Sequence, residues 1–196
     1  MAEKSIIGTQ TEKNLVIAYL SESAAYSRYT YYAQQATKEG YFPVANVFNE
    51  TAANELHHGK IYFKFLQGGA VVGVDVSTNA GVIADTASNL KTAMAEELSE
   101  GVDFYVKSAA TAREEGFDEI ADHFAAIATI EKKHYERFGR YLKHIEDGTL
   151  WKRDKPVKWQ CLVCGYIFEG TEPPKPCPAC DHPYQHYIAL DDLVLE

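Results

Sequence analysis

Residues 54–60 read NELHHGK and contain no glycine or proline before Gly59, so the stretch is compatible with a helix. On a helix, Glu55 and His58 are three residues apart and share a face, whereas His57 points elsewhere. A carboxylate and an imidazole in this arrangement can bind one metal ion. The same pattern also occurs in solvated polar turns, and the remainder of the chain has to distinguish the two interpretations.

Helical periodicity occurs in four stretches of the first 147 residues. Apolar side chains recur at steps of three and four residues within 15–32, 44–65, 90–104 and 120–141, which places them on one face of each helix. The stretch 67–89, QGGAVVGVDVSTNAGVIADTASN, is rich in glycine and too long for a tight turn. The pattern predicts a mainly α fold, a four-helix bundle in which one long crossover joins two helical hairpins.

Acidic residues interrupt all four apolar faces. The first and third faces each carry one glutamate, and the second and fourth each carry Glu-x-x-His; these residues are Glu22, Glu55, His58, Glu97, Glu131 and His134. Burying an unpaired carboxylate costs several kcal/mol, so several inward-facing glutamates require a compensating charge. Bound cations are the simplest compensation. The alternative is that these residues lie at the solvent edge of each face.

An internal repeat links the two hairpins. When residues 36–66 are shifted by 76 positions, nine of the 31 residues are identical. The pairs are Ala36/Ala112, Glu39/Glu115, Gly40/Gly116, Ala45/Ala121, Phe48/Phe124, Ala52/Ala128, Glu55/Glu131, His58/His134 and Leu66/Leu142, with Glu22/Glu97 at the neighbouring offset of 75. His58 is thus paired with a histidine, whereas His57 is paired with Lys133. We therefore expect His58 to be the ligand and His57 to lie on the surface.

The four glutamates and two histidines match the di-iron carboxylate pattern of ferritin-like bundles. Carboxylates can bridge two cations, and each imidazole can cap one metal. This predicts bridging positions for Glu55 and Glu131 and terminal positions for Glu22 and Glu97. Mixed oxygen and nitrogen ligation in a redox context favours iron, although manganese or zinc can occupy the same ligands.

Tyr29 and Tyr105 lie one or two helical turns beyond Glu22 and Glu97. The periodicity leaves open whether they pack in the core or hydrogen-bond to the predicted metal ligands. The other histidines, at positions 57, 123, 144, 182 and 186, are predicted to be surface or packing residues.

Composition excludes several classes of protein. The hydrophobic content of 46% is that of a globular protein, and the net charge of −9 argues against binding of nucleic acid. The N-terminal sequence lacks the apolar run of a signal peptide, and no stretch is long enough to span a membrane. All four cysteines lie in two Cys-x-x-Cys pairs near the C-terminus, which fits a reducing, cytoplasmic compartment.

Composition also changes near residue 150. Six of the seven prolines lie between Pro156 and Pro183. We place a boundary within residues 146–156, EDGTLWKRDKP, with Gly148 as a helix C-cap. The expected domains are 1–148 and 149–196.

The C-terminal module reads WQCLVCGYIFEGTEPPKPCPACDHPYQHY over residues 159–187. Its pairs Cys161/Cys164 and Cys177/Cys180 are separated by twelve residues. Four thiolates so placed form a tetrahedral site for zinc or for a single iron. The reducing compartment disfavours two disulfides, and spacing alone leaves the metal open. The string CxxCGY…CPxC, with aromatic residues around it, favours a rubredoxin-like iron site.

The order of these motifs resembles the rubrerythrin family over essentially the whole chain. The segments concerned are LSESAAYSRY around Glu22, NELHHGK, EELSE, IEKKHYERF and the rubredoxin-like tail, together with TEKNL, REEG and GVIADT. The resemblance implies a cytoplasmic di-iron peroxidase that reduces hydrogen peroxide to water and protects against oxidative stress. Its electrons would come from rubredoxin or an NAD(P)H-dependent reductase through the iron of the four-cysteine site. Members are typically homodimers in which the rubredoxin domain of one subunit faces the di-iron site of the other.

The resemblance also implies a seventh bundle ligand, Glu100, beside the six glutamates and histidines already named. Two departures from the family pattern occur. The segment SESAAYSRY replaces an expected Gln-Ala-Arg segment after Glu22, and His57 precedes the ligand histidine. Neither departure changes an implied ligand.

Two other classes of protein remain open from the sequence. A ferritin-like ferroxidase or iron-storage protein would share the bundle but would not need a redox module with four cysteines. A zinc-ribbon binding protein would use the tail for partner recognition, but the buried carboxylates would then be unexplained. Colour separates these classes, because thiolate-to-iron absorption makes an oxidised rubredoxin-type site red, whereas a zinc site is colourless.

Overall fold

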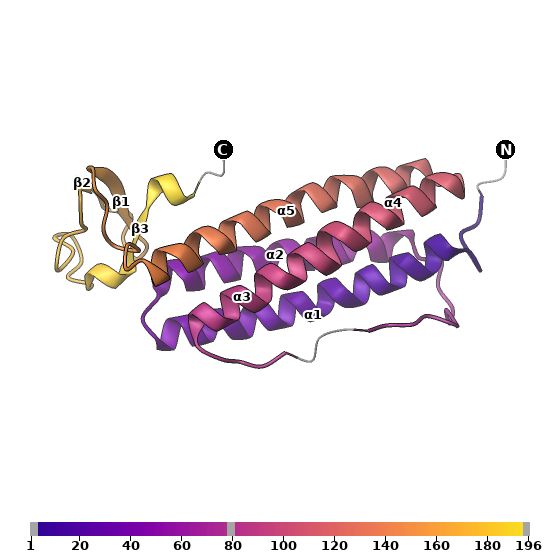
Figure 1. Ribbon diagram of the computed structural model, residues 1–196, viewed down its shortest axis with the longest axis horizontal. Helices are drawn as coiled ribbons and strands as arrows, with labels where there is room; N and C mark the ends of the chain where they lie inside the picture. Colours follow the sequence, from indigo (N-terminus) through magenta and orange to yellow (C-terminus); the bar gives the residue numbers. More distant parts are fainter. Residues whose placement is uncertain (1–3, 78–80, 194–196) are drawn as a thin grey trace.

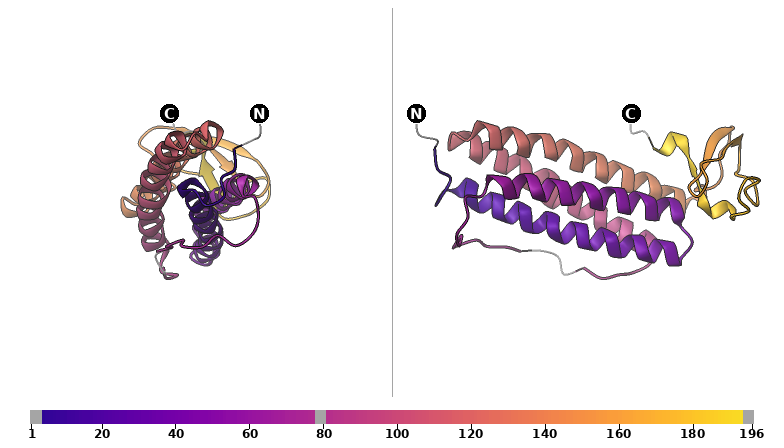
Figure 2. Two further views of the ribbon diagram at one scale, coloured as in Figure 1. Left: turned by 90° about the vertical axis from the view of Figure 1, so that its right-hand side faces the viewer. Right: turned by 180° about the vertical axis from the view of Figure 1, so that it is seen from behind.

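The computed structural model describes residues 4–77 and 81–193 and contains four long helical rods that lie side by side (Figure 1). The elements are α1 (Gln10–Lys38), α2 (Phe42–Phe65), α3 (Thr86–Glu96), η1 (Glu97–Phe104), α4 (Tyr105–Glu114) and α5 (Asp118–Glu146), of which α3, η1 and α4 together form the third rod. The end-on view in Figure 2 shows the rods grouped as a bundle. The mainly helical fold predicted from the sequence is confirmed. Within the described ranges, no helix combines the length and the hydropathy needed to cross a membrane.

A long crossover joins the two hairpins and follows the outside of α1 (Figure 1). Its described residues between Leu66 and Asp85 form no helix or strand. The sequence placed this crossover at 67–89, but α3 begins earlier, at Thr86. The reason is an N-cap, because the Asp85 side chain accepts a hydrogen bond of 3.0 Å from the backbone N–H of Ser88.

The third rod is interrupted by a π-helix, η1, at Glu97–Phe104. Wider helical turns of this kind accommodate one extra residue and frequently occur at functional sites. The repeat contains that extra residue: Glu22 recurs 75 positions later as Glu97, whereas Tyr29 recurs 76 positions later as Tyr105. The spacing between repeat partners thus grows from 75 to 76 residues between Glu97 and Tyr105. The second hairpin therefore has one extra residue relative to the first, and η1 accommodates it. The prediction of one regular helical face over 90–104 missed this interruption.

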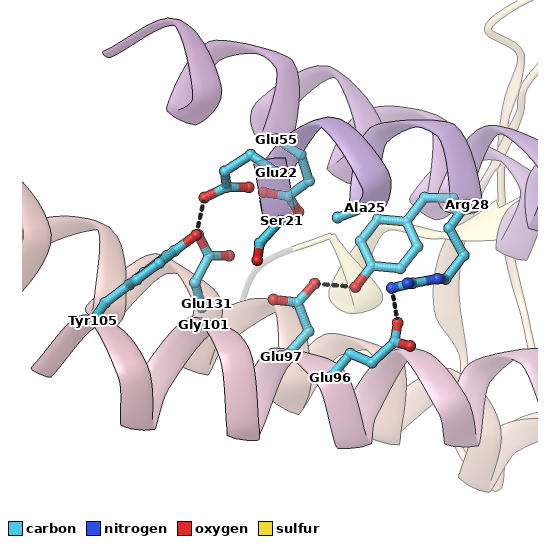
Figure 3. Close-up of a pocket in the computed structure, with 11 residues that line it drawn as sticks. Ser21, Glu22, Ala25, Arg28, Glu55, Glu96, Glu97, Gly101, Tyr105 and Glu131 are labelled. Carbon is cyan, nitrogen blue, oxygen red and sulfur yellow. Dashed lines mark hydrogen bonds and ion pairs between the residues drawn. The ribbon is translucent and has the colours of Figure 1, made fainter. Parts of the chain in front are cut away.

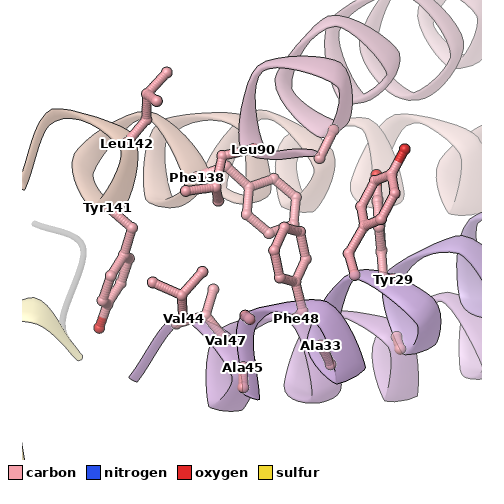
Figure 4. Packing of buried hydrophobic residues seen from close by; sticks show 14 of the residues in the cluster. Tyr29, Ala33, Val44, Ala45, Val47, Phe48, Leu90, Phe138, Tyr141 and Leu142 are labelled. Atoms are coloured by element: carbon pink, nitrogen blue, oxygen red, sulfur yellow. The ribbon is translucent and has the colours of Figure 1, made fainter. Parts of the chain in front are cut away.

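Two buried clusters of apolar side chains fill the bundle. One contains Tyr29, Phe48 and Phe138 (Figure 4), whose ring centroids are 5.1 to 6.0 Å apart. The other contains Tyr105 and Phe124, with centroids 5.7 Å apart. Aromatic pairs at such separations contribute about 0.5–1.5 kcal/mol beyond the burial of their area. The two clusters therefore hold the helices rigidly at two levels of the bundle.

The C-terminal residues form a small antiparallel sheet beyond the end of α5 (Figure 1). Its strands are β1 (Val157–Cys161), β2 (Ile167–Gly170) and β3 (Tyr187–Ala189), in the order β2-β1-β3, and two short 3-10 helices, η2 (Tyr184–His186) and η3 (Leu190–Asp192), flank β3. This arrangement places Cys161 at the end of the central strand.

The sheet packs against the end of the bundle. Ile188 is 1% exposed and belongs to the same buried cluster as Phe48, and Phe42 at the start of α2 stacks on His186 with centroids 3.7 Å apart. Oδ1 of Asp192 lies 3.2 Å from Nε2 of His144 on α5. These contacts attach the tail to the bundle at a fixed position.

The last helix of the bundle ends as the sequence predicted. Gly148 has a φ of +66°, a left-handed conformation that glycine adopts at little cost. The N–H groups of Gly148 and Thr149 donate to the carbonyls of Ile145 and His144 at 3.2 and 2.9 Å, the Schellman arrangement of helix ends. The predicted C-cap is confirmed, whereas the division into domains 1–148 and 149–196 stays a prediction.

Each hairpin caps the first helix of the other. Glu115, in the turn between α4 and α5, accepts hydrogen bonds from the N–H groups of Gln10 and Thr11 at 3.1 and 2.8 Å. Its repeat partner Glu39, in the turn between α1 and α2, accepts one of 3.0 Å from the N–H of Thr86. Both caps satisfy N–H groups that the helix itself leaves unbonded.

We expect Glu115→Ala to lower the free energy of unfolding by about 1 kcal/mol, the usual cost of losing a helix cap. Urea unfolding followed by circular dichroism measures this loss. The matched control is Glu114→Ala, because Glu114 is exposed and next to Glu115 in sequence. An equal loss in the two variants would show that the cap contributes nothing of its own.

Candidate di-metal site

Buried side chains from all four rods meet in the middle of the bundle. They form two groups whose ligand atoms lie within 4.8 Å of one another: Glu22, Glu55, His58 and Glu131, and Glu55, Glu97, Glu131 and His134. Figure 3 shows the four carboxylates converging on one pocket. The structure thus brings together all six residues that the sequence pattern singled out. Glu55 and Glu131 are common to both groups, which is the arrangement expected of bridging ligands.

Both imidazoles present Nδ1 to the shared carboxylates. Nδ1 of His58 lies 2.9 Å from Oε1 of Glu131 and 3.0 Å from Oε2 of Glu55. Nδ1 of His134 lies 2.8 Å from Oε2 of Glu131 and 3.2 Å from Oε1 of Glu55. The side-chain amide of Asn54 lies 3.2 Å from Nε2 of His134. This contact orients the ring, and sequence reasoning missed it because Asn54 has no polar partner in the repeat.

Tyr29 and Tyr105 connect the site to the two apolar clusters. The Tyr29 hydroxyl donates to Oε1 of Glu97, and the Tyr105 hydroxyl donates to Oε1 of Glu22, both at 2.7 Å. Their side chains are 1% and 2% exposed. From the sequence, core packing and hydrogen bonding to the ligands were alternative roles for these tyrosines. In the structure, each tyrosine has both roles.

The carboxylates of the metal-free chain repel one another. Burial, followed by the charges of neighbouring glutamates, raises the pKa of Glu22 and of Glu97 well above the usual value. Burial alone would also raise the pKa of Glu131, but hydrogen bonds from His134 and His58 lower it to about 2. The cluster therefore holds more negative charge than the chain itself can stabilise.

The residues fit two bound metal ions. Oε1 of Glu55 and Oε1 of Glu131 are buried and face the Nδ1 atoms of His134 and His58 at 3.2 and 2.9 Å, and each oxygen can accept a further contact. Four ionised glutamates would balance the charge of two divalent cations if both imidazoles were neutral. Oxygen and imidazole ligands of this kind suit iron, manganese or zinc. A pair of cations would therefore balance the charge and bind these buried oxygens.

Two predicted features lie at the edge of this site. Glu100 falls within η1, but its side chain is outside the described part of the structure, so its role as a seventh ligand stays a prediction. His57 is exposed on α2, as expected of a surface residue. Sequence reasoning missed Arg28 and Glu96, whose buried ion pair lines the same pocket (Figure 3).

The four cysteines form a second cluster, in the tail. Their sulfur atoms lie within 4.8 Å of one another, and the Sγ atoms are 3.8 Å apart in the pairs Cys161–Cys180 and Cys164–Cys177. All four are free thiols, so the disulfide alternative does not hold in this structure. The arrangement suits one tetrahedrally bound metal ion.

The fold and the two clusters define a four-helix protein with a candidate di-iron site and a rubredoxin-like domain. A rubrerythrin family model matches residues 13–142, and a model of the rubredoxin-like domain of rubrerythrin matches residues 159–188. The chain belongs to the rubrerythrin family. It is 47% identical over 184 residues to rubrerythrin of Porphyromonas gingivalis, covering 94% of this chain and 92% of that relative. Rubrerythrin of Nitratidesulfovibrio vulgaris is 44% identical, with 95% and 97% covered.

Solved structures show the same fold. Fully reduced, all-ferrous nigerythrin aligns with a TM-score of 0.62 at 26% identity, covering 95% of this chain and 92% of that chain. Dithionite-reduced symerythrin from Cyanophora paradoxa aligns with a TM-score of 0.59 at 21% identity, covering 74% of this chain and 89% of that chain. The second likeness shows the fold alone.

We expect the melting temperature of the metal-free protein to fall as the pH rises from about 6.5 to about 9. Burial alone would lower the pKa of His58, but hydrogen bonds to Glu131 and Glu55 raise it to about 9. A pKa that is higher in the folded than in the unfolded state stabilises the fold below the unfolded value, about 6.5 for histidine. That stabilisation is lost as the pH rises through the folded value.

Calorimetry of chelator-treated and metal-loaded protein across this pH range tests the expectation. The loaded protein is the control, because imidazoles that bind a metal are neutral throughout the range and its profile should be flatter. A melting temperature of the metal-free protein that stays constant or rises with pH would contradict the assignment.

Replacing Tyr105 with phenylalanine should weaken metal binding by about 10- to 100-fold, because Glu22 loses the hydroxyl that orients it. Competition with a chelator during titration of a divalent cation measures the dissociation constant. Tyr141→Phe is the matched control, since the Tyr141 hydroxyl is buried and has no hydrogen-bond partner among the described residues. If the two variants bind metal equally well, the Tyr105 hydroxyl does not contribute to metal binding.

Proposed function

We propose that this protein is a non-haem di-iron peroxidase that reduces hydrogen peroxide to water with electrons relayed through a four-cysteine iron site. The observation that carries the proposal is the presence, in one chain, of a buried cluster of four glutamates and two histidines and of a cluster of four cysteines. A ferroxidase or storage bundle has no use for the second cluster. Nigerythrin, whose structure is known in a fully reduced, all-ferrous state, is a relative that holds iron.

Three irons per chain are proposed, two in the bundle and one in the tail. Metal analysis of protein purified without air tests this stoichiometry, and the absorption of an oxidised thiolate–iron site gives a second readout. Stoichiometric zinc in the tail would remove the electron-transfer part of the proposal while leaving the bundle site untouched.

Reduction of hydrogen peroxide to two water molecules breaks the O–O bond and consumes two electrons and two protons. Two bound ferrous ions would supply the electrons. The chain's own residues hold the site: Glu55 and Glu131 present oxygens to both metal positions, and Tyr29 and Tyr105 orient the remaining two glutamates. The pocket, with a cavity volume of about 20 Å³, has room for about one water-sized molecule.

The two metal centres of one chain lie far apart. Glu131 precedes the end of α5 at Glu146 by 15 residues, or about 22 Å at the helical rise, and the tail lies beyond that end (Figure 1). Because electron transfer slows steeply with distance, we place the relay between chains. In the proposed homodimer, the cysteine domain of one subunit faces the bundle of the other. The proposed location of the protein is the cytoplasm, and its proposed role is protection against oxidative stress. Rubredoxin or an NAD(P)H-dependent reductase is the proposed external donor.

Glu100 is proposed as the seventh ligand of the bundle site. Its counterpart on α1, three residues after Glu22, is Ala25, so the two metal positions would differ in their ligands. An additional hard oxygen ligand favours the ferric state of the metal that it binds.

A full-length variant with Cys161→Ala and Cys164→Ala should keep two bundle irons but lose turnover that is coupled to a reductase. The full chain is used because truncation would remove Ile188 from the buried cluster of the bundle. Chemically prereduced variant should still be oxidised by peroxide, since every glutamate and histidine of the bundle site remains. Reductase-coupled turnover at the rate of the unmodified protein would exclude the tail as the relay.

A further inference from the structure

The pocket that holds the carboxylates lies between α1 and the third rod (Figure 3), and some of the α1 residues that line it are partly exposed. Its floor is formed by the glutamates of the site, and its outer wall on α1 is formed by Ser21 and Ala25, which are half-buried. Gly101 on η1 lies on the other side. A Cβ atom on Gly101 would come within 2.6 Å of the Glu131 side chain, so the residue there has to be small. On α1, the half-buried residues Ser21 and Ala25 that line this mouth have small side chains.

A buried ion pair stands at one end of the mouth. The guanidinium of Arg28 on α1 donates to Oε2 of Glu96 on α3, and the two side chains are 12% and 7% exposed. Both residues line the same pocket as the site glutamates. Because the pair joins α1 to the third rod, it fixes the distance between the two walls of the mouth.

A second groove lies on the other side of α1 and is narrow where it approaches the site. This groove of about 390 Å³ between α1 and α2, lined by Ser23 and Phe63, also reaches Glu55. At this level, however, a Cβ atom on Gly59 would lie 3.2 Å from Cβ of Glu22. The backbones of α1 and α2 are therefore in close contact, which narrows the route from this groove at the level of Glu22.

We propose that the mouth between α1 and the third rod is the substrate entrance and that Ala25 is the residue that selects substrates by size. This inference rests on the proposed peroxidase function. The carboxylate pocket has room for about one water-sized molecule, about 20 Å³, so the entrance is expected to admit hydrogen peroxide and to exclude a hydroperoxide that carries an aromatic or branched group. The methyl group of Ala25 sets the width, because Gly101 offers no side chain and the Arg28–Glu96 pair prevents the walls from moving apart.

The test compares variants at two positions of α1 that lie two residues apart. Ala25→Leu and Ala25→Val narrow the mouth, Ala25→Gly widens it, and Ser23→Leu fills the groove on the other side as the matched control. Prereduced, iron-loaded proteins are mixed anaerobically with hydrogen peroxide or cumene hydroperoxide, and oxidation is followed optically. Binding of azide to the oxidised protein gives a second readout, because azide has to pass the same entrance without being reduced.

We expect Ala25→Leu to slow both oxidation by hydrogen peroxide and association of azide by about tenfold or more, as steric mismatch in a small site does. Ala25→Gly should raise the rate with cumene hydroperoxide relative to that with hydrogen peroxide. Ser23→Leu should match the unmodified protein. Iron content and the optical spectrum should be the same in all variants. If Ala25→Leu loads iron poorly, Ala25→Val and Ala25→Gly decide the outcome.

Three results would overturn the inference: slowing by Ser23→Leu without slowing by Ala25→Leu, equal rates in all variants, or an unchanged preference between the two hydroperoxides in Ala25→Gly. Failure of the peroxidase proposal is distinguishable from these. In that case the unmodified protein reduces neither hydroperoxide, while azide association still reports whether Ala25 controls the entrance.

Discussion

Four carboxylates are buried together in the middle of the bundle, and the surrounding structure compensates for their mutual repulsion. Two unit charges 4 Å apart repel by about 4 kcal/mol at the effective dielectric constant near a protein surface, and such a pair occurs several times in this cluster. Contacts with the imidazoles of His58 and His134 and with the hydroxyls of Tyr29 and Tyr105 offset part of this repulsion. Two aromatic clusters hold those donors in position. Bound cations would neutralise the negative charge that the side chains alone leave uncompensated.

The repeat explains how much of this arrangement was predictable from the sequence. A buried position that recurs in both copies is visible as a pair, and for that reason the glutamate–histidine pairs and the four helical stretches could be predicted. Arg28 and Glu96 have no such signal, because their positions in the other copy are occupied by Phe104 and Ser21. Such an asymmetric contact between distant segments becomes visible only when the helices are placed in space.

The π-helix was missed for a related reason. Apolar periodicity over 90–104 is compatible with one continuous α-helix, and the offset of 75 for Glu22 and Glu97 differed from 76 by a single residue. Only the backbone of η1 shows where that residue is accommodated. The contact between the tail and the bundle was likewise invisible, since Ile188 lies in a segment that the motifs assign to the cysteine module.

The reciprocal contacts between the hairpins bear on how the bundle arose. Glu39 caps the second hairpin and Glu115 caps the first, and Tyr29 and Tyr105 cross in the same way. A single hairpin would lack both its cap and its tyrosine, so an ancestral hairpin would be complete only in a symmetric pair of identical chains. In such a pair, any insertion would be present twice and both metal positions would be equivalent. Joining the hairpins in one chain would let an insertion such as that in η1 change one position without the other.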